Sequence, residues 1–166
     1  DVYKRQQLEP TDINELIKES MRFLEPEIKD RGLNLTLELR SALPVLELDP
    51  DQIKQAFYNI VKNSIQATPE GGIITVKTDL SDNHILVTFK DTGEGISAEN
   101  LSTVFQPYFT TKKSGTGLGL LIIRRIIREH GGDIKISSEE GFGTSVCISL
   151  PRQQRNVRLL PLVQKK

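Results

Sequence analysis

A single helical pattern constrains this chain more than any other feature, because both its start and its faces can be assigned. The pattern runs from about Pro50 to Ala67, with Asp49 as N-cap, proline at the first helical position and Gln52 completing a capping box. Its apolar face comprises Ile53, Phe57, Ile60, Val61 and Ile65. A helix with one apolar stripe has to bury that stripe, so we expect it to pack on a sheet.

Alternating apolar residues elsewhere predict the strands of that sheet. We expect strands over 33–39 and 45–48, a hairpin of 73–78 with 85–90 around residues 81–83, and two last strands near 133–137 and 144–150. Asp12 and Glu15 predict the start of a first helix, which Pro26 is expected to kink, and a third helix is expected from Leu118 to His130. This order predicts an α/β (α+β) two-layer sandwich, a mixed sheet of about five strands with three main helices on one face.

The composition is that of one globular domain without a strong field of either sign. The chain has 166 residues, and 22 basic side chains balance 22 acidic ones, so no overall charge argues for nucleic acid as a partner. No apolar run approaches the roughly 20 residues that span a bilayer, so we expect no membrane contact by this fragment and a cytoplasmic location, although missing segments can still anchor the full-length protein. The single cysteine, Cys147, is expected to be a buried structural thiol.

The ends of the chain suggest a piece of a longer protein. It opens on Asp1 rather than methionine, so we expect a fragment in which residues 1–7 are partly non-native. Residues 1–12 are expected to end a linker, 13–151 to form the domain, and 152–166 to be a basic tail, disordered by default. An apolar patch from Val157 to Val163 leaves a docking role for the tail open.

The helix over 50–67 also carries a polar stripe, with Asn59, Asn63 and Gln66 at i, i+4 and i+7. Asparagine is a poor residue for a helix interior, so this stripe needs a reason. The ordinary explanation is that these side chains face solvent or that neighbouring groups satisfy their amides. The other explanation is metal coordination, because neutral amide oxygens suit Mg²⁺ when phosphate oxygens supply the charge.

A glycine-rich turn follows the strand that ends near Lys90, in the segment Asp91-Thr-Gly-Glu-Gly-Ile96. Asp-x-Gly is in itself an ordinary turn. A carboxylate at that place can also accept a hydrogen bond from the exocyclic amine of adenine, whereas it would face the O6 acceptor of guanine unfavourably. The turn is therefore a candidate base site.

A second glycine segment, Gly115-x-Gly117-x-Gly119, leads into the third helix. The first-turn amides of a helix are unpaired and favour anions, so phosphates would bind well there. The spacing fits neither a dinucleotide fingerprint nor a Walker loop, and a plain flexible linker is the alternative.

Between the two glycine segments lies an aromatic and then basic stretch, from Phe105 to Ser114. Phe105 and Phe109 could anchor a hinged lid in the core, and Lys112 or Lys113 could reach phosphates when it closes. A solvated basic loop would have the same composition.

Taken together, these motifs resemble the catalytic ATP-binding (HATPase-type) domain of sensor histidine kinases, within the GHKL superfamily. The resemblance covers roughly Asn14 to Pro151. It rests on the order of the helix asparagines, D-x-G-x-G, F-x-P-x-F, G-x-G-x-G and Gly141-Phe-Gly-Thr144. The sequence from Phe105 to Lys112 is most similar to that of kinases related to nitrogen-regulation sensors.

The resemblance implies a protein that binds Mg²⁺ and ATP and donates the γ-phosphoryl group to a histidine in two-component signal transduction. It implies Asn63 as the Mg²⁺ ligand, Asn59 as a helper near the phosphates and Asp91 as the adenine anchor. Lys112 would act from a lid over 106–117. Thr144 would support adenine through its hydroxyl. The other pocket residues that it implies are Gly93, Gly95, Ile96, Gly115, Thr116, Gly117, Leu118, Gly119 and Leu120.

The implied partners are ATP or ADP, the dimerisation and histidine phosphotransfer domain of the same protein, which would be a homodimer at full length, and the receiver domain of a response regulator. The acceptor is expected to be missing from this chain. His84 and His130 are not followed by the acid that marks the family's phosphoacceptor, so both are expected to be structural.

Asn59 separates this chain from the hydrolytic members of the superfamily, which place a water-activating glutamate four residues before the metal asparagine. An amide cannot act as that base, so hydrolysis is disfavoured as the main reaction. Two alternatives stay open: a nucleotide-gated binding module without catalysis, and an anti-sigma-type serine kinase. Intact motifs count against the first, and Asn59 in place of glutamate counts against the second.

Overall fold

The computed structural model describes residues 6–105 and 119–152. The elements in chain order are β1 (Glu9–Thr11), α1 (Ile13–Asp30), β2 (Asn34–Glu38), β3 (Leu46–Leu48), α2 (Pro50–Ala67), β4 (Ile73–Ser81), β5 (His84–Asp91), α3 (Ala98–Leu101), α4 (Gly119–Glu129), β6 (Asp133–Glu139) and β7 (Gly143–Pro151).

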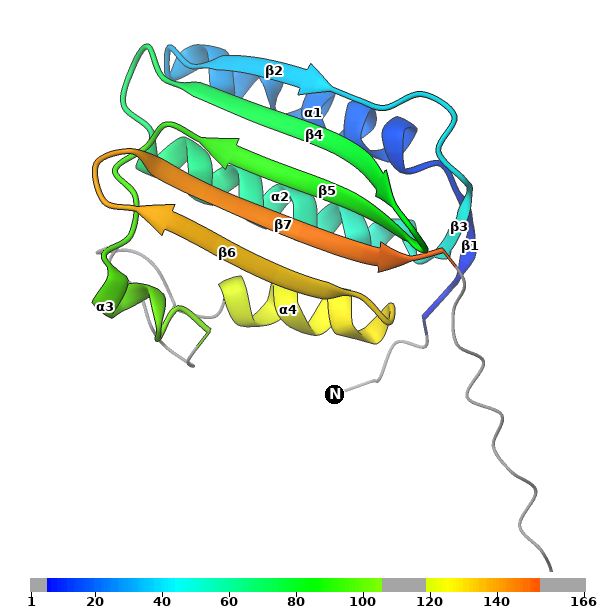
Figure 1. Cartoon of the computed structure of the whole chain (residues 1–166). Coiled ribbons are helices and arrows are strands. Elements are labelled where there is room, and N and C mark those ends of the chain that lie inside the picture. The colour runs from blue at the N-terminus through cyan, green and yellow to red at the C-terminus, as the bar shows by residue number, and fades with distance from the viewer. Residues whose placement is uncertain (1–5, 106–118, 153–166) are drawn as a thin grey trace, which may run out of the picture.

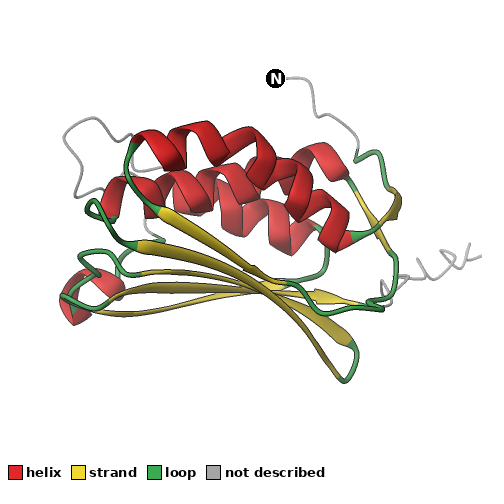
Figure 2. Cartoon of the chain, turned by 90° about the horizontal axis from the view of Figure 1, so that it is seen from above, coloured by secondary structure: helices red, strands yellow, loops and turns green. Residues whose placement is uncertain are grey.

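The fold is a two-layer sandwich, as the sequence predicts. Strands β2, β4, β5, β7 and β6 form, in that order, a five-stranded sheet, in which β2 pairs in parallel with β4 and the other neighbours are antiparallel. Helices α1, α2 and α4 lie side by side on one face of this twisted sheet (Figures 1 and 2). Within the part of the chain that the structure describes, no helix combines the length and apolar character needed to cross a bilayer.

The core lies between these helices and the inner face of the sheet. Phe89 of β5 pairs with Val76 of β4 on one side and Val146 of β7 on the other, and all three are buried. The ring of Phe57 on α2 packs against that of Phe89, with centroids 5.3 Å apart. The whole apolar stripe predicted for α2 is buried. The inward positions of β5 continue to Asp91, which places its side chain on the helix side of the sheet.

A buried hydrogen-bond junction connects the start of α2 to the end of α4. Asp49 caps α2 by accepting from the Gln52 N–H at 3.2 Å, and its own N–H donates to Nε2 of His130 at 3.1 Å. The other ring nitrogen of His130 donates to the Ile126 carbonyl at 2.7 Å, since Nε2 accepts. Both ring nitrogens are used, and only 2% of the residue is exposed, so the structural role predicted for His130 is confirmed.

The segment before α1 differs from the expected linker, because Glu9–Thr11 forms β1 and pairs antiparallel with β3. The N–H of Gln7 also donates to the Asp49 carboxylate at 3.1 Å. Ordered structure therefore begins before residue 13. These contacts join positions about forty residues apart, which local sequence patterns cannot reveal.

One smaller expectation stays a prediction and another needs correction. Helix α1 continues through the exposed Pro26 to Asp30, so the proline does not end the helix, and the kink expected there stays a prediction. Cys147 is half-buried rather than buried, because it alternates with the inward-facing Val146 and Ile148 and so lies on the other face of the sheet.

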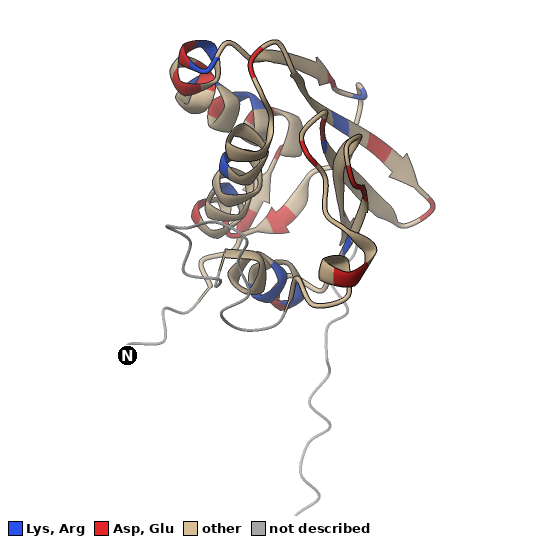
Figure 3. Cartoon of the chain, turned by 90° about the vertical axis from the view of Figure 1, so that its left-hand side faces the viewer, with Lys and Arg blue, Asp and Glu red and all other residues tan. Residues whose placement is uncertain are grey.

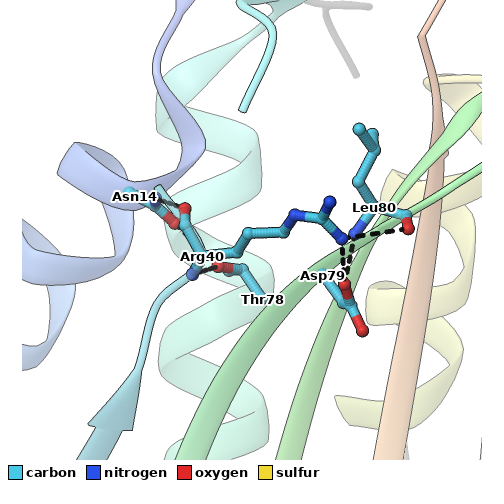
Figure 4. Close-up of polar contacts among 5 residues, drawn as sticks. All are labelled: Asn14, Arg40, Thr78, Asp79 and Leu80. Atoms are coloured by element: carbon cyan, nitrogen blue, oxygen red, sulfur yellow. Dashed lines mark hydrogen bonds and ion pairs between the residues drawn. The ribbon is translucent and has the colours of Figure 1, made fainter. Parts of the chain in front are cut away.

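A small polar network fixes the start of α1 to strand β4 and to the segment that follows β2 (Figure 4). The Thr78 hydroxyl donates to the Asn14 side chain and accepts from the Arg40 N–H, each at 2.9 Å. The Asn14 amide closes the ring by donating to the Arg40 carbonyl at 2.7 Å. The Arg40 guanidinium also pairs with Asp79 at 2.7 Å, and this hydrogen bond lowers the pKa of that exposed carboxyl below its usual value of 3.8.

Thr78→Val should destabilise the domain by about 1–2 kcal/mol, because it keeps the shape of a buried side chain but removes both hydrogen bonds. Urea or thermal unfolding would measure it. Asp79→Asn is the matched control, since an exposed ion pair contributes little. A lowered pKa means that any contribution from Asp79 is present above pH 3.8 and is lost as the pH falls further. Equal unfolding curves for the two variants at neutral pH would contradict the prediction.

Candidate functional site

The Asp91 carboxylate is the most enclosed acid at the end of the sheet where β5 stops. Only 4% of the residue is exposed. Its Oδ1 accepts the backbone N–H groups of Gly93 at 3.0 Å and Thr144 at 3.1 Å, and its Oδ2 accepts the Ser64 hydroxyl at 2.8 Å. A buried carboxylate is tolerated only with such partners. The three donors come from α2, the turn after β5, and β7, so Asp91 joins three parts of the fold.

The hydrogen bonds to Asp91 leave a defined acceptor position. Each carboxylate oxygen has about two lone-pair sites. Two donors fill Oδ1, whereas Oδ2 receives one donor from the described residues. The remaining site on Oδ2 can accept one further N–H, which is what an exocyclic amine offers.

The turn after Asp91 packs closely on two neighbouring backbones, and its glycines are required for that. A Cβ at Gly93 would lie 2.6 Å from the Ala67 carbonyl oxygen at the end of α2. A Cβ at Gly95, where φ is +73°, would lie 2.2 Å from the Glu139 carbonyl oxygen. Glu94 between them donates to Ala67 and accepts from the Gly141 N–H, at 3.0 and 2.7 Å. The predicted shaping role of Gly93 and Gly95 stays a prediction, but both are sterically required here.

Ser138 of β6 makes several hydrogen bonds beside Thr144, at the start of β7. Its hydroxyl lies 2.8 Å from the Thr144 hydroxyl, 2.9 Å from the Gly143 carbonyl oxygen and 2.8 Å from the N–H of Ile96. Thr144 thus contacts Asp91 through its backbone, while its side chain lies against Ser138. Ile96 is half-buried beside them.

The polar stripe of α2 runs past the same place. Asn59 and Asn63 are half-buried and stand one turn apart, whereas Gln66 is exposed. Asn63 directly precedes Ser64, the donor to Asp91, so the predicted metal ligand and the predicted base anchor are connected through this adjacent residue.

The donor chemistry of the described residues fits Mg²⁺ bound mainly by phosphate. No group of three or more His, Cys, Asp or Glu side chains that could hold a metal ion occurs among residues 6–105 and 119–152. An amide such as that of Asn63 supplies a hard neutral oxygen, which suits an ion whose remaining ligands are water and triphosphate oxygens.

Part of the predicted site lies outside the described residues. This holds for the proposed lid over 106–117, with Lys112, and for Gly115, Thr116, Gly117 and Leu118. Gly119 and Leu120, which are half-buried, begin α4. Directly before residue 106, Phe105 is partly buried against the core, and the Arg124 guanidinium lies 5.1 Å from its ring centroid.

Sequence reasoning missed Ser64 and Ser138. Ser64 is a hydroxyl between the apolar residues of the buried α2 face, which was a usable signal, because a buried hydroxyl needs a partner. Ser138 carries no such signal in an exposed edge strand. Figure 3 shows acidic and basic residues spread over both layers, in keeping with the balanced charge.

The chain matches a known protein family and is similar to histidine kinases. Residues 48–154 match the family model described as histidine kinase-, DNA gyrase B-, and HSP90-like ATPase. The chain is similar to the sensor histidine kinase ZraS of Escherichia coli K12, with 37% identity over 87% of this chain and 31% of ZraS. The chain thus spans about a third of that relative.

Two solved structures are also similar. The catalytic domain of histidine kinase ThkA shares 33% identity at a TM-score of 0.80, covering 88% of this chain and 96% of that one. ThkA in complex with the response regulator protein TrrA shares 31% identity at a TM-score of 0.76, covering 88% of this chain and 42% of that one.

Proposed function

The chain belongs to the family of histidine kinase-, DNA gyrase B- and HSP90-like ATPases, as a histidine kinase catalytic domain, and from this premise we propose that it binds Mg²⁺ and ATP and donates the γ-phosphoryl group to a histidine on a separate dimerisation domain. The observation that supports ATP most directly is the buried Asp91 carboxylate, on which three donors from residues 6–105 and 119–152 leave one acceptor position. That position suits the amine of adenine.

The described residues divide the work of binding between the two ends of ATP. Asp91 and the turn carrying Gly93 and Gly95 hold the base, while Asn63 and Asn59 on α2 lie toward the phosphates. Gly119 and Leu120 at the start of α4 extend the phosphate side, and Thr144 supports the base side. Bound Mg²⁺, held by Asn63, would neutralise charge on the triphosphate.

Residue 59 is an asparagine and cannot act as a general base, which favours phosphoryl transfer to a histidine over hydrolysis of ATP. Asn59 cannot deprotonate water, so this chain positions ATP and leaves the attack to a nucleophile from elsewhere. In that step a ring nitrogen of the acceptor histidine forms a bond to the γ-phosphorus as the bond to the departing ADP oxygen breaks. The two histidines of this chain are not placed to be that acceptor. His130 is buried with both ring nitrogens in hydrogen bonds, and His84 starts β5 at the opposite end of that strand from Asp91.

The proposed partners follow from the same scheme. The acceptor histidine would belong to the dimerisation domain of the full-length protein, to which residues 1–12 would lead, and the phosphoryl group would pass on to a receiver domain. The solved complex of the similar kinase ThkA with a response regulator supports that second step. We propose that the domain comprises residues 13–151 and is preceded by the short β1. We propose a cytoplasmic location for it. Residues 152–166 are proposed as a tail.

Asn63→Ala should remove most of the Mg²⁺-dependent gain in ATP affinity, by about tenfold or more, because a direct metal ligand is lost. Calorimetric titration with ATP, in Mg²⁺ and then with a chelator, would measure this. Gln55→Ala, an exposed amide truncation on the same helix, is the control and should bind like the parent. An unchanged Mg²⁺ dependence in Asn63→Ala would remove Asn63 from the metal site.

Phosphotransfer itself needs a separate experiment. The domain, radiolabelled γ-phosphate ATP and the dimerisation domain of the full-length protein should together yield an acid-labile, base-stable label on that domain. ATP binding without any label would favour the gated binding module, and a label on serine would favour the serine kinase.

A further inference from the structure

Ser64 is a hydroxyl placed among apolar side chains on the buried face of α2. It is 5% exposed, and its neighbours along that face include Ile60, Val61 and Ile65. A hydroxyl is costly in such surroundings unless it makes a hydrogen bond. Its bond to Oδ2 of Asp91, at 2.8 Å, is made to a carboxylate, and such charge-assisted bonds are the stronger ones.

This bond decides which acceptor site of Asp91 is left for a ligand. Gly93 and Thr144 both donate to Oδ1 and, because a carboxylate is planar, hold the plane of the group through that oxygen. Ser64 donates to Oδ2 and so occupies one of the two acceptor sites on that oxygen. The site that remains on Oδ2 therefore has a defined direction.

The helix that carries Ser64 is itself fixed to the base turn. The Ala67 carbonyl accepts the Glu94 N–H at 3.0 Å, and the Thr68 hydroxyl donates to the Ser64 carbonyl at 2.6 Å. The Ser64 hydroxyl therefore starts from a rigid position, as a group that orients another must.

We propose that Ser64 is a positioning residue for base recognition: its hydroxyl holds Oδ2 of Asp91 and occupies one of its two acceptor sites, so that the remaining site meets the 6-amine of adenine. This inference rests on the proposed function, because it assumes that Asp91 receives the base. It assigns Ser64 an effect on the amine alone, not on the phosphates or Mg²⁺.

The test compares ATP with purine riboside 5′-triphosphate, which lacks the 6-amine. The parent should prefer ATP, and Ser64→Ala should reduce that preference by about tenfold, the equivalent of one charged hydrogen bond. Its affinity for the amine-free nucleotide should stay close to that of the parent. Ser64→Thr, which keeps the hydroxyl, should restore the preference. Each ratio is measured on one folded variant, so a general loss of stability cancels.

Ser20→Ala is the matched control, because Ser20 is a buried helical hydroxyl that donates to the Leu16 carbonyl at 2.8 Å on α1. It should leave the ATP preference unchanged. An equal loss for both nucleotides in Ser64→Ala, or a full ATP preference in that variant, would overturn the proposal. A parent that binds both nucleotides alike would overturn Asp91 as the anchor of the amine, and a parent that binds neither would overturn the proposed function itself.

Discussion

Gly143→Ala is expected to destabilise the domain by about 3 kcal/mol or more and to abolish ATP binding. A Cβ on this residue would lie 2.0 Å from the Asp91 carbonyl oxygen and 3.1 Å from Cα of Thr92, and φ is +118°. These close atoms all belong to the backbone, so no side chain can move aside. Either the β5–β7 pairing opens at its end or Asp91 shifts. The melting temperature should fall by roughly 6–12 °C, measured by scanning calorimetry.

Gly141→Ala separates the steric cause from the conformational one. Gly141 lies two residues earlier in the same turn with φ +84°, but a Cβ there meets nothing within 4 Å. This variant pays only for the left-handed backbone, about 1–2 kcal/mol, and should still bind ATP. If the two variants had the same melting temperature, the close approach of Gly143 to Asp91 would not be what excludes a side chain at residue 143.

The elements with local signals could be predicted from the sequence. Helix α2 starts at Pro50 as its cap and proline predict, because both act within one turn. The hairpin of β4 and β5 was likewise predictable from alternation and a polar turn. Strand β1 was not, because three residues have no periodicity, and it is held by β3 and Asp49 from far along the chain.

The site divides in the same way. Asp91 could be singled out because it ends an alternating strand at a glycine turn. The partners of Ser64 and Ser138 could not be assigned, because their contacts to Asp91 and Ile96 span 27 and 42 residues. The place of Ser64 on an apolar helix face indicates that its hydroxyl needs a partner, but not which one. The roles predicted for Lys112, Gly115 and Gly117 stay predictions.

Asp91→Asn is expected to fold nearly as well as the parent and yet to lose ATP binding by about a hundredfold or more. The amide can keep its oxygen toward the N–H groups of Gly93 and Thr144, and the Ser64 hydroxyl can rotate to accept from the new NH₂ group. All three contacts then survive, and only the one with Ser64 changes its donor. The group left facing the base, however, is a donor instead of an acceptor.

The affinity of Asp91→Asn for inosine triphosphate, which has an acceptor at the 6-position, should fall far less than that for ATP, so the ratio of the two affinities measures the reversal. Asp91→Ala should behave differently, because it leaves three donors without an acceptor at a site that is 4% exposed. Such unsatisfied groups cost about 1–3 kcal/mol each, so this variant should lose stability. It should also bind ATP and inosine triphosphate with similar affinities. An Asp91→Asn variant that still preferred ATP would place the base elsewhere, whatever its stability.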